Sequence, residues 1–140
     1  MRIGIAVSEW NSGITEKLFE GAKKALLENG VKEKNILRKN VPGSFELPLA
    51  AQFFCQTNTD AVICVGCVIH GETRHFEFIC QAVALGIKDV SLKYNKPIVF
   101  GVLTTDNLQQ AKDRAGGKHG NKGIEAAISV LKMLELKNNF

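Results

Sequence analysis

The segment Ala61–Ile69, AVICVGCVI, is an unbroken apolar run in the middle of the chain. A strand that is apolar on both faces is typical of the centre of a parallel sheet, because helices cover both faces of such a sheet. The run is about half the length of the roughly 20 residues that a membrane-spanning helix needs. The segment therefore predicts a buried central strand, with the rest of the fold arranged around it.

Shorter apolar segments alternate with amphipathic stretches on both sides of this strand. The patterns predict three more strands, at residues 2–7, 36–41 and 97–103. They predict helices at residues 14–29, 47–55, 76–93, 106–115 and 122–136. Gly30 suits a helix C-terminus, Pro48 suits a first helical turn, and Asp106 with Gln109 resembles a capping box. Strands that alternate with helices predict one α/β domain over residues 1–140, with a parallel sheet between two helical layers.

The composition is that of an ordinary globular protein. Of 140 residues, 45% are hydrophobic and 23% are charged, which excludes a disordered or collagen-like chain. The net charge is +4, from 18 basic and 14 acidic residues. The densest basic cluster, at residues 112–122, suits one anionic small molecule better than a polyanion, so we expect no nucleic-acid partner. No apolar run is long enough to span a membrane, so no membrane partner is expected either. No cationic start precedes an apolar run, so no signal peptide is predicted and a cytoplasmic location is expected.

Two of the four cysteines, Cys64 and Cys67, have the spacing found in zinc sites and redox motifs. In a strand, however, side chains three residues apart point to opposite faces, so these two thiols cannot bind one ligand. The cysteines are therefore interpreted as small buried residues in a reducing compartment. The three histidines, at positions 70, 75 and 119, lack metal-ligand spacing, and no metal site is predicted.

Aromatic and ionisable residues gather in the loops that follow the predicted strands. These loops span residues 8–13, 42–46, 70–75 and 104–106, and they carry Trp10, Phe45, Glu46, Thr73, Arg74 and His75. Ligands of open parallel sheets bind outside the carboxyl ends of the strands. The sequence therefore predicts a binding site at this edge. No GxGxxG motif follows the first strand, so a dinucleotide is not the expected ligand.

Several residues suit a phosphorylated substrate and proton transfer, and each has a structural alternative. His75 can exchange protons near neutral pH, or it is a surface or capping histidine. Arg114 and Lys122 flank a loop with four glycines and suit a phosphate, or they belong to a solvated basic turn. Residues 71–73 lead into a helix N-terminus, which also attracts phosphate, or they only cap that helix.

Two aromatic side chains suit a ring-containing substrate. Trp10 can stack on a heterocycle, or it only covers the sheet edge. Phe45 and Glu46 can hold a ring and accept from hydroxyl groups, or they are a core residue and a helix-start carboxylate. Together these residues predict a site for a phosphorylated, ring-containing or polyhydroxylated substrate, with proton transfer at a histidine.

Four blocks of sequence resemble lumazine synthase. They are VPGSFELP at residues 41–48, GCVIHGETRHFE at 66–77, FGVLTT at 100–105 and RAGGKHGNKG at 114–123. The blocks stand in the family's order and spacing and cover nearly the whole chain, so together they are specific. The resemblance implies a flavodoxin-like fold, which is a three-layer α/β/α sandwich with a four-stranded parallel sheet.

The resemblance also implies the penultimate step of riboflavin biosynthesis. The family condenses two small-molecule substrates, 5-amino-6-(D-ribitylamino)uracil and 3,4-dihydroxy-2-butanone 4-phosphate. The products are 6,7-dimethyl-8-ribityllumazine, phosphate and water. No cofactor and no metal is implied.

Site residues follow from the resemblance position by position. The implied contacts to the pyrimidine and its ribityl chain are Trp10, Ser44, Phe45, Glu46 and the backbone of Cys67, Val68 and Ile69. The implied phosphate-side loop is formed by Glu72 and Thr73. His75 matches the proton-transfer residue. Residues implied to come from the neighbouring subunit are Phe100 and Arg114, with Arg114 binding phosphate. Lys122 matches a further site lysine, and Glu125 is implied to orient this cluster.

Three features depart from the family pattern. His70 stands where many relatives have arginine, and Cys67 stands where threonine or alanine is usual. The chain also begins close to its first strand, whereas many relatives have a leading segment that pairs with a neighbour's sheet.

An oligomer is implied as well. The family forms a homo-pentamer with sites between adjacent subunits, and some members build a shell of twelve pentamers. The short loop 116–121 resembles that of shell formers, whereas the missing leading segment would weaken contacts, so pentamer and shell both stay open. Association with riboflavin synthase is a further implied interaction.

Two alternatives stay open at the level of sequence. An archaeal-type riboflavin synthase shares the fold but dismutates two lumazines. A lumazine- or flavin-binding module, or a shell-building scaffold, would have no catalytic activity. The blocks around His75 and residues 114–122 favour lumazine synthase, which alone of the three would consume the butanone phosphate.

Overall fold

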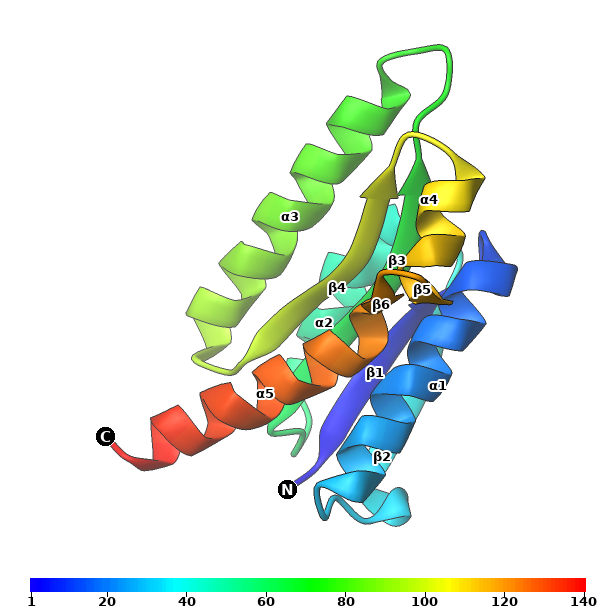
Figure 1. The fold of residues 1–140 in the computed structure, drawn as a ribbon. Helices are drawn as coiled ribbons and strands as arrows, with labels where there is room; N and C mark the ends of the chain where they lie inside the picture. Colours follow the sequence, from blue (N-terminus) through cyan, green and yellow to red (C-terminus); the bar gives the residue numbers. More distant parts are fainter.

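A sheet of four parallel strands runs through the middle of the molecule (Figure 1). A computed structural model describes every residue from Met1 to Phe140. The strands are β1 (Ile3–Ser8), β2 (Ile36–Val41), β3 (Ala61–Ile69) and β4 (Ile98–Thr105), and they lie side by side in the order β2-β1-β3-β4. This order and direction confirm the predicted flavodoxin-like parallel sheet.

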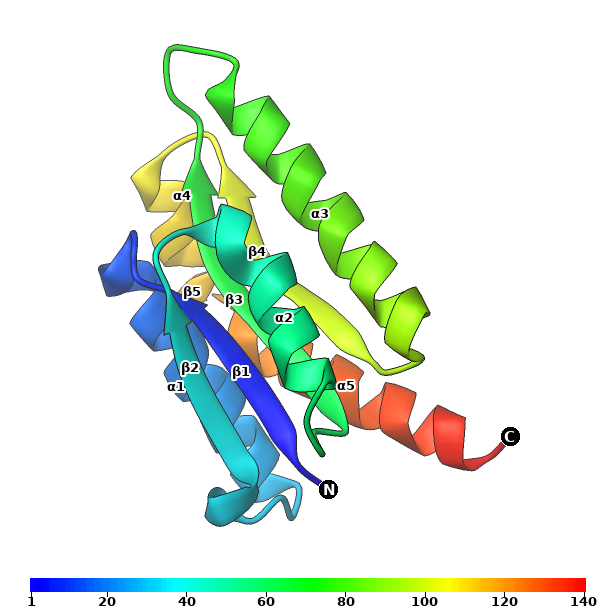
Figure 2. The same ribbon diagram turned by 180° about the vertical axis from the view of Figure 1, so that it is seen from behind.

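Helices cover both faces of the sheet, as predicted. One face carries α1 (Ser12–Glu28), the short α4 (Leu108–Asp113) and α5 (Lys122–Asn138). The opposite face carries α2 (Leu47–Cys55) and α3 (His75–Tyr94), which Figure 2 shows in front of the strands. No helix has both the length and the apolarity needed to cross a bilayer.

The central strand supplies both hydrophobic cores. Ile63, Val65 and Cys67 pack with α1 and α5 in one core, whereas Val62 and Cys64 pack with α2 and α3 in the other. The alternation of side chains along a strand produces this division. The prediction that Cys64 and Cys67 lie on opposite faces is confirmed.

Some predicted boundaries are confirmed to the residue and others are wrong. β2, α2 and β3 have the predicted bounds, Pro48 lies in the first turn of α2, and Gly30 follows α1 with φ +90°. The capping box at Asp106 is wrong, because α4 begins at Leu108 and Asn107 Oδ1 accepts from the Gln110 N–H at 2.9 Å. Asparagine and aspartate cap helices about equally well, so composition alone does not choose between neighbouring positions.

The predicted loop 116–121 is a small hairpin. Its strands are β5 (Ala115–Gly117) and β6 (Gly120–Asn121), which pair in antiparallel fashion. Gly116 and Gly120 have positive φ values of 96° and 82°, a backbone conformation that glycine adopts without strain. The glycines therefore form a tight turn rather than an open loop.

β3 extends beyond β1 at its carboxyl end. The β1–β3 pairing ends at Val7 opposite Val65, whereas the β3–β4 pairing continues to Ile69 opposite Thr105. The last residues of β3 therefore have a paired edge toward β4 and an edge toward β1 that is not paired with a strand. This open edge of β3 positions the candidate site.

Candidate active site

A pocket of about 480 Å³ lies at the carboxyl end of the sheet, and we call it the sheet-end pocket. The loops after β1 and β2, the end of β3 and the start of α3 form its walls. Its lining residues are Trp10, Asn11, Ser44, Phe45, Glu46, Cys67, Val68, Ile69, His75 and Ile79. The structure thus brings together eight of the predicted site residues, and it adds Asn11 and Ile79.

Two aromatic rings stand at the rim of this pocket. Trp10 is 67% exposed and Phe45 is 58% exposed, so both present apolar surface to solvent. Trp10 lies over the turn after β2, where its backbone N–H donates to the Pro42 carbonyl at 3.1 Å. A Cβ atom at Gly43 would lie 2.5 Å from Trp10 Cε3, so the missing side chain at Gly43 makes room for the indole.

Ser44 and Glu46 belong to the turn that opens α2. The Ser44 side chain is buried, and its hydroxyl has no hydrogen-bond partner. A buried polar group without a partner is costly, so such a hydroxyl in a pocket wall is suited to a polar ligand. Glu46 Oε2 accepts from the Gly43 N–H at 3.0 Å, which orients the carboxylate at the pocket.

The open edge of β3 forms the floor of the pocket. Cys67 carries its carbonyl on the β1 side, where the Asn11 side-chain amide donates to it at 2.9 Å. The His70 N–H points the other way and donates to Thr105 of β4 at 2.8 Å. Because peptide groups alternate along a strand, the N–H and carbonyl of Ile69 share the open side with Cys67. This strip can pair with the edge of a planar heterocycle.

Of the predicted loop 70–75, only His75 lines the pocket. His75 is the first residue of α3, and its side chain is exposed. The Thr73 hydroxyl accepts from the His75 backbone N–H at 3.3 Å, at the start of α3. Glu72 is exposed and does not line the pocket. The His70 ring lies 5.0 Å from the Phe76 ring and so packs on α3.

Burial affects the thiol in this pocket. It raises the pKa of the Cys67 thiol to about 11, because the apolar surroundings disfavour the thiolate. The side chain therefore stays protonated at neutral pH and is a poor nucleophile. Across the whole chain, no three His, Cys, Asp or Glu side chains are grouped as metal ligands.

A second pocket, of about 500 Å³, lies along β4 between α4 and α5, and we call it the basic pocket. Its charged and polar lining residues are Thr104, Thr105, Gln110, Arg114, His119, Lys122 and Glu125. Arg114 Nη1 donates to the Gln110 carbonyl at 3.0 Å, which holds the guanidinium in place while its other N–H groups remain for a ligand. The predicted group of Arg114, Lys122 and Glu125 is brought together here.

The two pockets share no lining residue. Phe100 belongs to neither, because it lies on β4, half-buried against the core formed with α2 and α3. Within one chain, the predicted site residues are therefore divided into an aromatic group at the sheet end and a basic group at β4.

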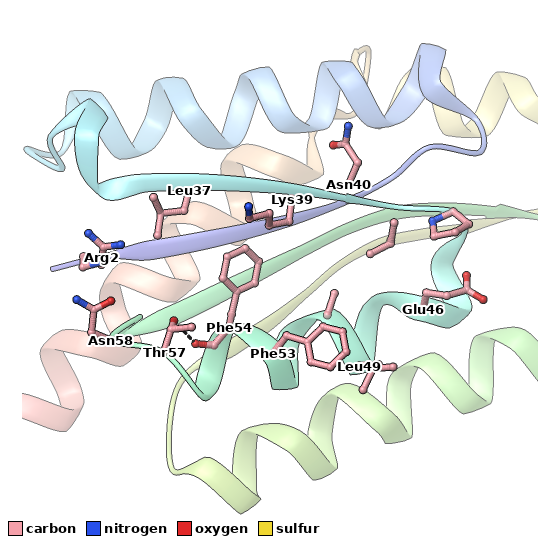
Figure 3. Close-up of a pocket in the computed structure, with 13 residues that line it drawn as sticks. Arg2, Leu37, Lys39, Asn40, Glu46, Leu49, Phe53, Phe54, Thr57 and Asn58 are labelled. Atoms are coloured by element: carbon pink, nitrogen blue, oxygen red, sulfur yellow. Dashed lines mark hydrogen bonds between the residues drawn. The ribbon is translucent and has the colours of Figure 1, made fainter.

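The largest pocket lies between β2 and α2 and shares only Glu46 with the sheet-end pocket (Figure 3). It measures about 810 Å³, and its walls include Leu37, Leu49, Phe53 and Phe54. Of the predicted site residues only Glu46 reaches it. Because it gathers apolar side chains and few ionisable groups, this groove lacks the convergent polar groups expected of a catalytic site.

Asn11 and Ile79 are the pocket residues that the sequence analysis missed. Asn11 follows Trp10 directly and precedes α1, where an asparagine reads as an ordinary helix cap. Its contact with Cys67 spans 56 positions, and no local pattern signals it. Ile79 lies one helical turn after His75, and its sequence context is that of an ordinary apolar helix residue.

Comparisons with known proteins agree on one family. The profile described as 6,7-dimethyl-8-ribityllumazine synthase matches residues 1–138. A relative of that name from Cytophaga hutchinsonii is 65% identical over 132 residues, which cover 94% of this chain and 83% of the relative. Relatives of the same name from Parabacteroides distasonis and Porphyromonas gingivalis are each 53% identical, over 96% and 98% of this chain and 84% and 86% of their own lengths.

Proposed function

The chain belongs to the 6,7-dimethyl-8-ribityllumazine synthase family, and from this membership we propose that its two pockets are the halves of one active site. The enzyme is a transferase of riboflavin biosynthesis. It condenses 5-amino-6-(D-ribitylamino)uracil with 3,4-dihydroxy-2-butanone 4-phosphate to 6,7-dimethyl-8-ribityllumazine, phosphate and water. Membership of this family favours this reaction over the two alternatives of the sequence analysis.

The sheet-end pocket is the proposed site for the pyrimidine. Trp10 offers an indole face for stacking, and Ile69 offers an N–H and a carbonyl to the ring edge. The unpartnered Ser44 hydroxyl and the Glu46 carboxylate suit the hydroxyl groups of the ribityl chain. Phe45 lies at the rim of the sheet-end pocket, where its ring would contact the pyrimidine.

The basic pocket is the proposed site for the phosphate. Arg114 can form two parallel hydrogen bonds to phosphate oxygens, and Lys122 adds a second positive charge. The observation that carries the proposal is the division itself, because each pocket holds the chemistry for one substrate and lacks the chemistry for the other. We assign Glu72 and Thr73 to the loop beside the sheet-end pocket, whose backbone N–H groups would donate to the phosphate bound in the neighbouring basic pocket.

His75 is the proposed proton-transfer residue, because it lines the sheet-end pocket and a histidine can give and take protons near neutral pH. Carbinolamine formation, dehydration, phosphate elimination and ring closure each move a proton. Holding two reactants together contributes much of the acceleration in such condensations.

A homo-pentamer is the proposed assembly, with the sheet-end pocket of one subunit facing the basic pocket of the next. Phe100, which lies outside both pockets of its own chain, would then act on the neighbouring subunit's substrate. The pentamer alone and a shell of twelve pentamers both satisfy this arrangement. A cytoplasmic location and an association with riboflavin synthase complete the proposal.

Steady-state kinetics test the assignment of the basic pocket to the phosphate. Lumazine formation is followed by absorbance against an enzyme-free control. We expect Arg114→Ala to raise the KM for the butanone phosphate about 10- to 100-fold, because a charge-assisted hydrogen bond contributes about 1.5–3 kcal/mol. The KM for the pyrimidine should change little. Lys112→Ala, an exposed charge outside both pockets, is the matched control. An equal rise for both substrates would contradict the phosphate role.

A mixing experiment tests the division between subunits. Trp10→Ala and Arg114→Ala each damage one half of the site. If the site spans two subunits, reassembling the two variants together creates some sites with both halves intact, so activity should rise above that of either variant. Mixed particles that are no more active than the separate variants would place the whole site within one chain.

A further inference from the structure

Asn11 takes over a hydrogen bond at the point where β1 leaves the sheet. β1 ends at Ser8, and the next two N–H groups, of Glu9 and Trp10, donate to the Val41 and Pro42 carbonyls of the β2 side, at 2.8 and 3.1 Å. The chain has therefore turned away from β3. The Cys67 carbonyl receives the Asn11 side-chain amide instead, with Nδ2 at 2.9 Å.

The backbone at Asn11 makes a second demand on the residue type. Its φ of 61° and ψ of 43° lie in the left-handed region, where asparagine is tolerated better than most side chains. Although Asn11 is the N-cap of α1, its side chain forms no capping bond to that helix. The amide is thus committed to β3, and only asparagine combines this turn with this donor at little cost.

The left-handed turn at Asn11 and its hydrogen bond to Cys67 both affect the part of the pocket that is proposed to hold the pyrimidine. The turn at Asn11 directs the preceding residue, Trp10, so that its ring lies over Gly43. The amide engages the Cys67 carbonyl, so the free polar groups of the open strip begin at Ile69. Asn11 also lines the same pocket.

We propose that Asn11 is a positioning residue for the pyrimidine substrate, acting through the Trp10 ring and through the Cys67 carbonyl. The inference rests on the proposed assignment of the sheet-end pocket to the pyrimidine. Without the amide, the Cys67 carbonyl is a second acceptor on the floor of the pocket, and the loop that carries Trp10 loses its tie to β3. Pyrimidine binding then weakens, whereas phosphate binding in the basic pocket does not.

Trp10 is the only tryptophan in the chain, so its fluorescence reports on this pocket alone. The experiment titrates the assembled protein with 5-amino-6-(D-ribitylamino)uracil and follows Trp10 emission. Asn11→Gly keeps the left-handed turn and removes the amide, and Asn11→Asp keeps the size and replaces the donor with an acceptor. Asn95→Gly is the matched control, because Asn95 has φ 54° and ψ 43° at the C-cap of α3 and lines neither site pocket.

We expect Asn11→Gly to need about 3- to 10-fold more pyrimidine for half-saturation, the effect of losing one ordinary hydrogen bond. Asn11→Asp should bind the pyrimidine more weakly still, because its carboxylate faces the Cys67 carbonyl oxygen. In steady-state assays the KM for the pyrimidine should rise while kcat and the KM for the butanone phosphate stay near wild type. Asn95→Gly should match the wild type in both measurements.

Three results would overturn the inference, and they are distinguishable. If the wild type responds to the pyrimidine and both Asn11 variants titrate as it does, Asn11 has no positioning role. If Trp10 emission in the wild type does not respond at all, the assignment of the pocket fails and the inference fails with it. A fall in kcat with unchanged pyrimidine affinity would likewise contradict it. Circular dichroism and particle size verify that each variant is folded and assembled.

Discussion

Two glycines shape the sheet-end pocket by the side chains they lack. Gly43 leaves room for the Trp10 ring, and Gly66 leaves room for the Ser44 hydroxyl, which lies 2.5 Å from where a Cβ at Gly66 would be. Neither glycine has a positive φ, so the requirement at both positions is space rather than backbone conformation. The absence of a side chain at these two positions thus sets where an aromatic ring and a hydroxyl group can lie.

Gly43→Ala tests this role at the scale of one residue. The new methyl group would lie 2.5 and 2.7 Å from Trp10 Cε3 and Cζ3, so the exposed ring must move away. We expect the KM for the pyrimidine to rise several-fold and Trp10 emission to shift, with little change in melting temperature because the ring is free to move. Gly13→Ala, with nothing within 4 Å of the new methyl group, is the control. Unchanged emission and an unchanged KM would contradict the prediction.

The contact between α1 and α5 connects the basic pocket to the core. A Cβ at Gly123 would lie 1.8 Å from the Leu18 carbonyl oxygen, so the two helices touch at the backbone. Asn121 caps α5 by accepting from the N–H groups of Gly123 and Ile124, and its amide donates to the Lys17 carbonyl at 3.1 Å. One side chain therefore ties the start of α5, and with it Lys122, to α1.

Asn121→Ala tests whether this side chain holds the start of α5, and Lys122 with it, in place. Losing a helix cap costs about 0.5–2 kcal/mol of folding stability, so we expect a lower melting temperature. Because Lys122 is the next residue and lines the basic pocket, the KM for the butanone phosphate should rise more than the KM for the pyrimidine. Asn139→Ala, at the opposite end of α5, should leave both KM values unchanged. An equal change in both KM values for Asn121→Ala would show a general loss of structure instead.

At the scale of the whole molecule, one face carries large apolar side chains that the chain itself does not cover. Phe78, Leu85 and Leu92 follow one another at seven-residue intervals along α3 and are 66%, 57% and 73% exposed. The helix α2 lies on the same side of the sheet as α3 (Figure 2). Its Leu49 and Phe53 side chains are exposed at the groove between β2 and α2 (Figure 3). Apolar surface of this extent is typical of a protein that buries it against other subunits.

Leu85→Lys tests whether this face holds the assembly together. A charge in the middle of the α3 stripe has to be desolvated on assembly, so we expect smaller particles in sedimentation velocity and unchanged circular dichroism. Lumazine formation should fall with dissociation, because a lone chain would hold the two halves of the site apart. Leu27→Lys, on the exposed side of α1, is the matched control. A folded Leu85→Lys variant of wild-type size and activity would show that this face does not hold the assembly together.

Local sequence determined much of the fold. The apolar run of β3, the Pro48 turn of α2 and the Gly30 end of α1 were predictable, because neighbours along the chain decide them. The predicted helix start at Asp106 was wrong, because Asp106 and Asn107 are both good caps and only the surrounding contacts choose between them. The four family blocks likewise predicted most of the residues that the two pockets gather.

By itself, then, the sequence determined the elements, their parallel arrangement and the chemistry of the side chains at the sheet edge. The tertiary structure alone shows which distant side chains meet: Asn11 against Cys67 and Trp10 over Gly43. The physical reason is that helix and strand preferences act between near neighbours. These groupings depend instead on where β1 stops pairing with β3, which packing and register across the whole sheet set.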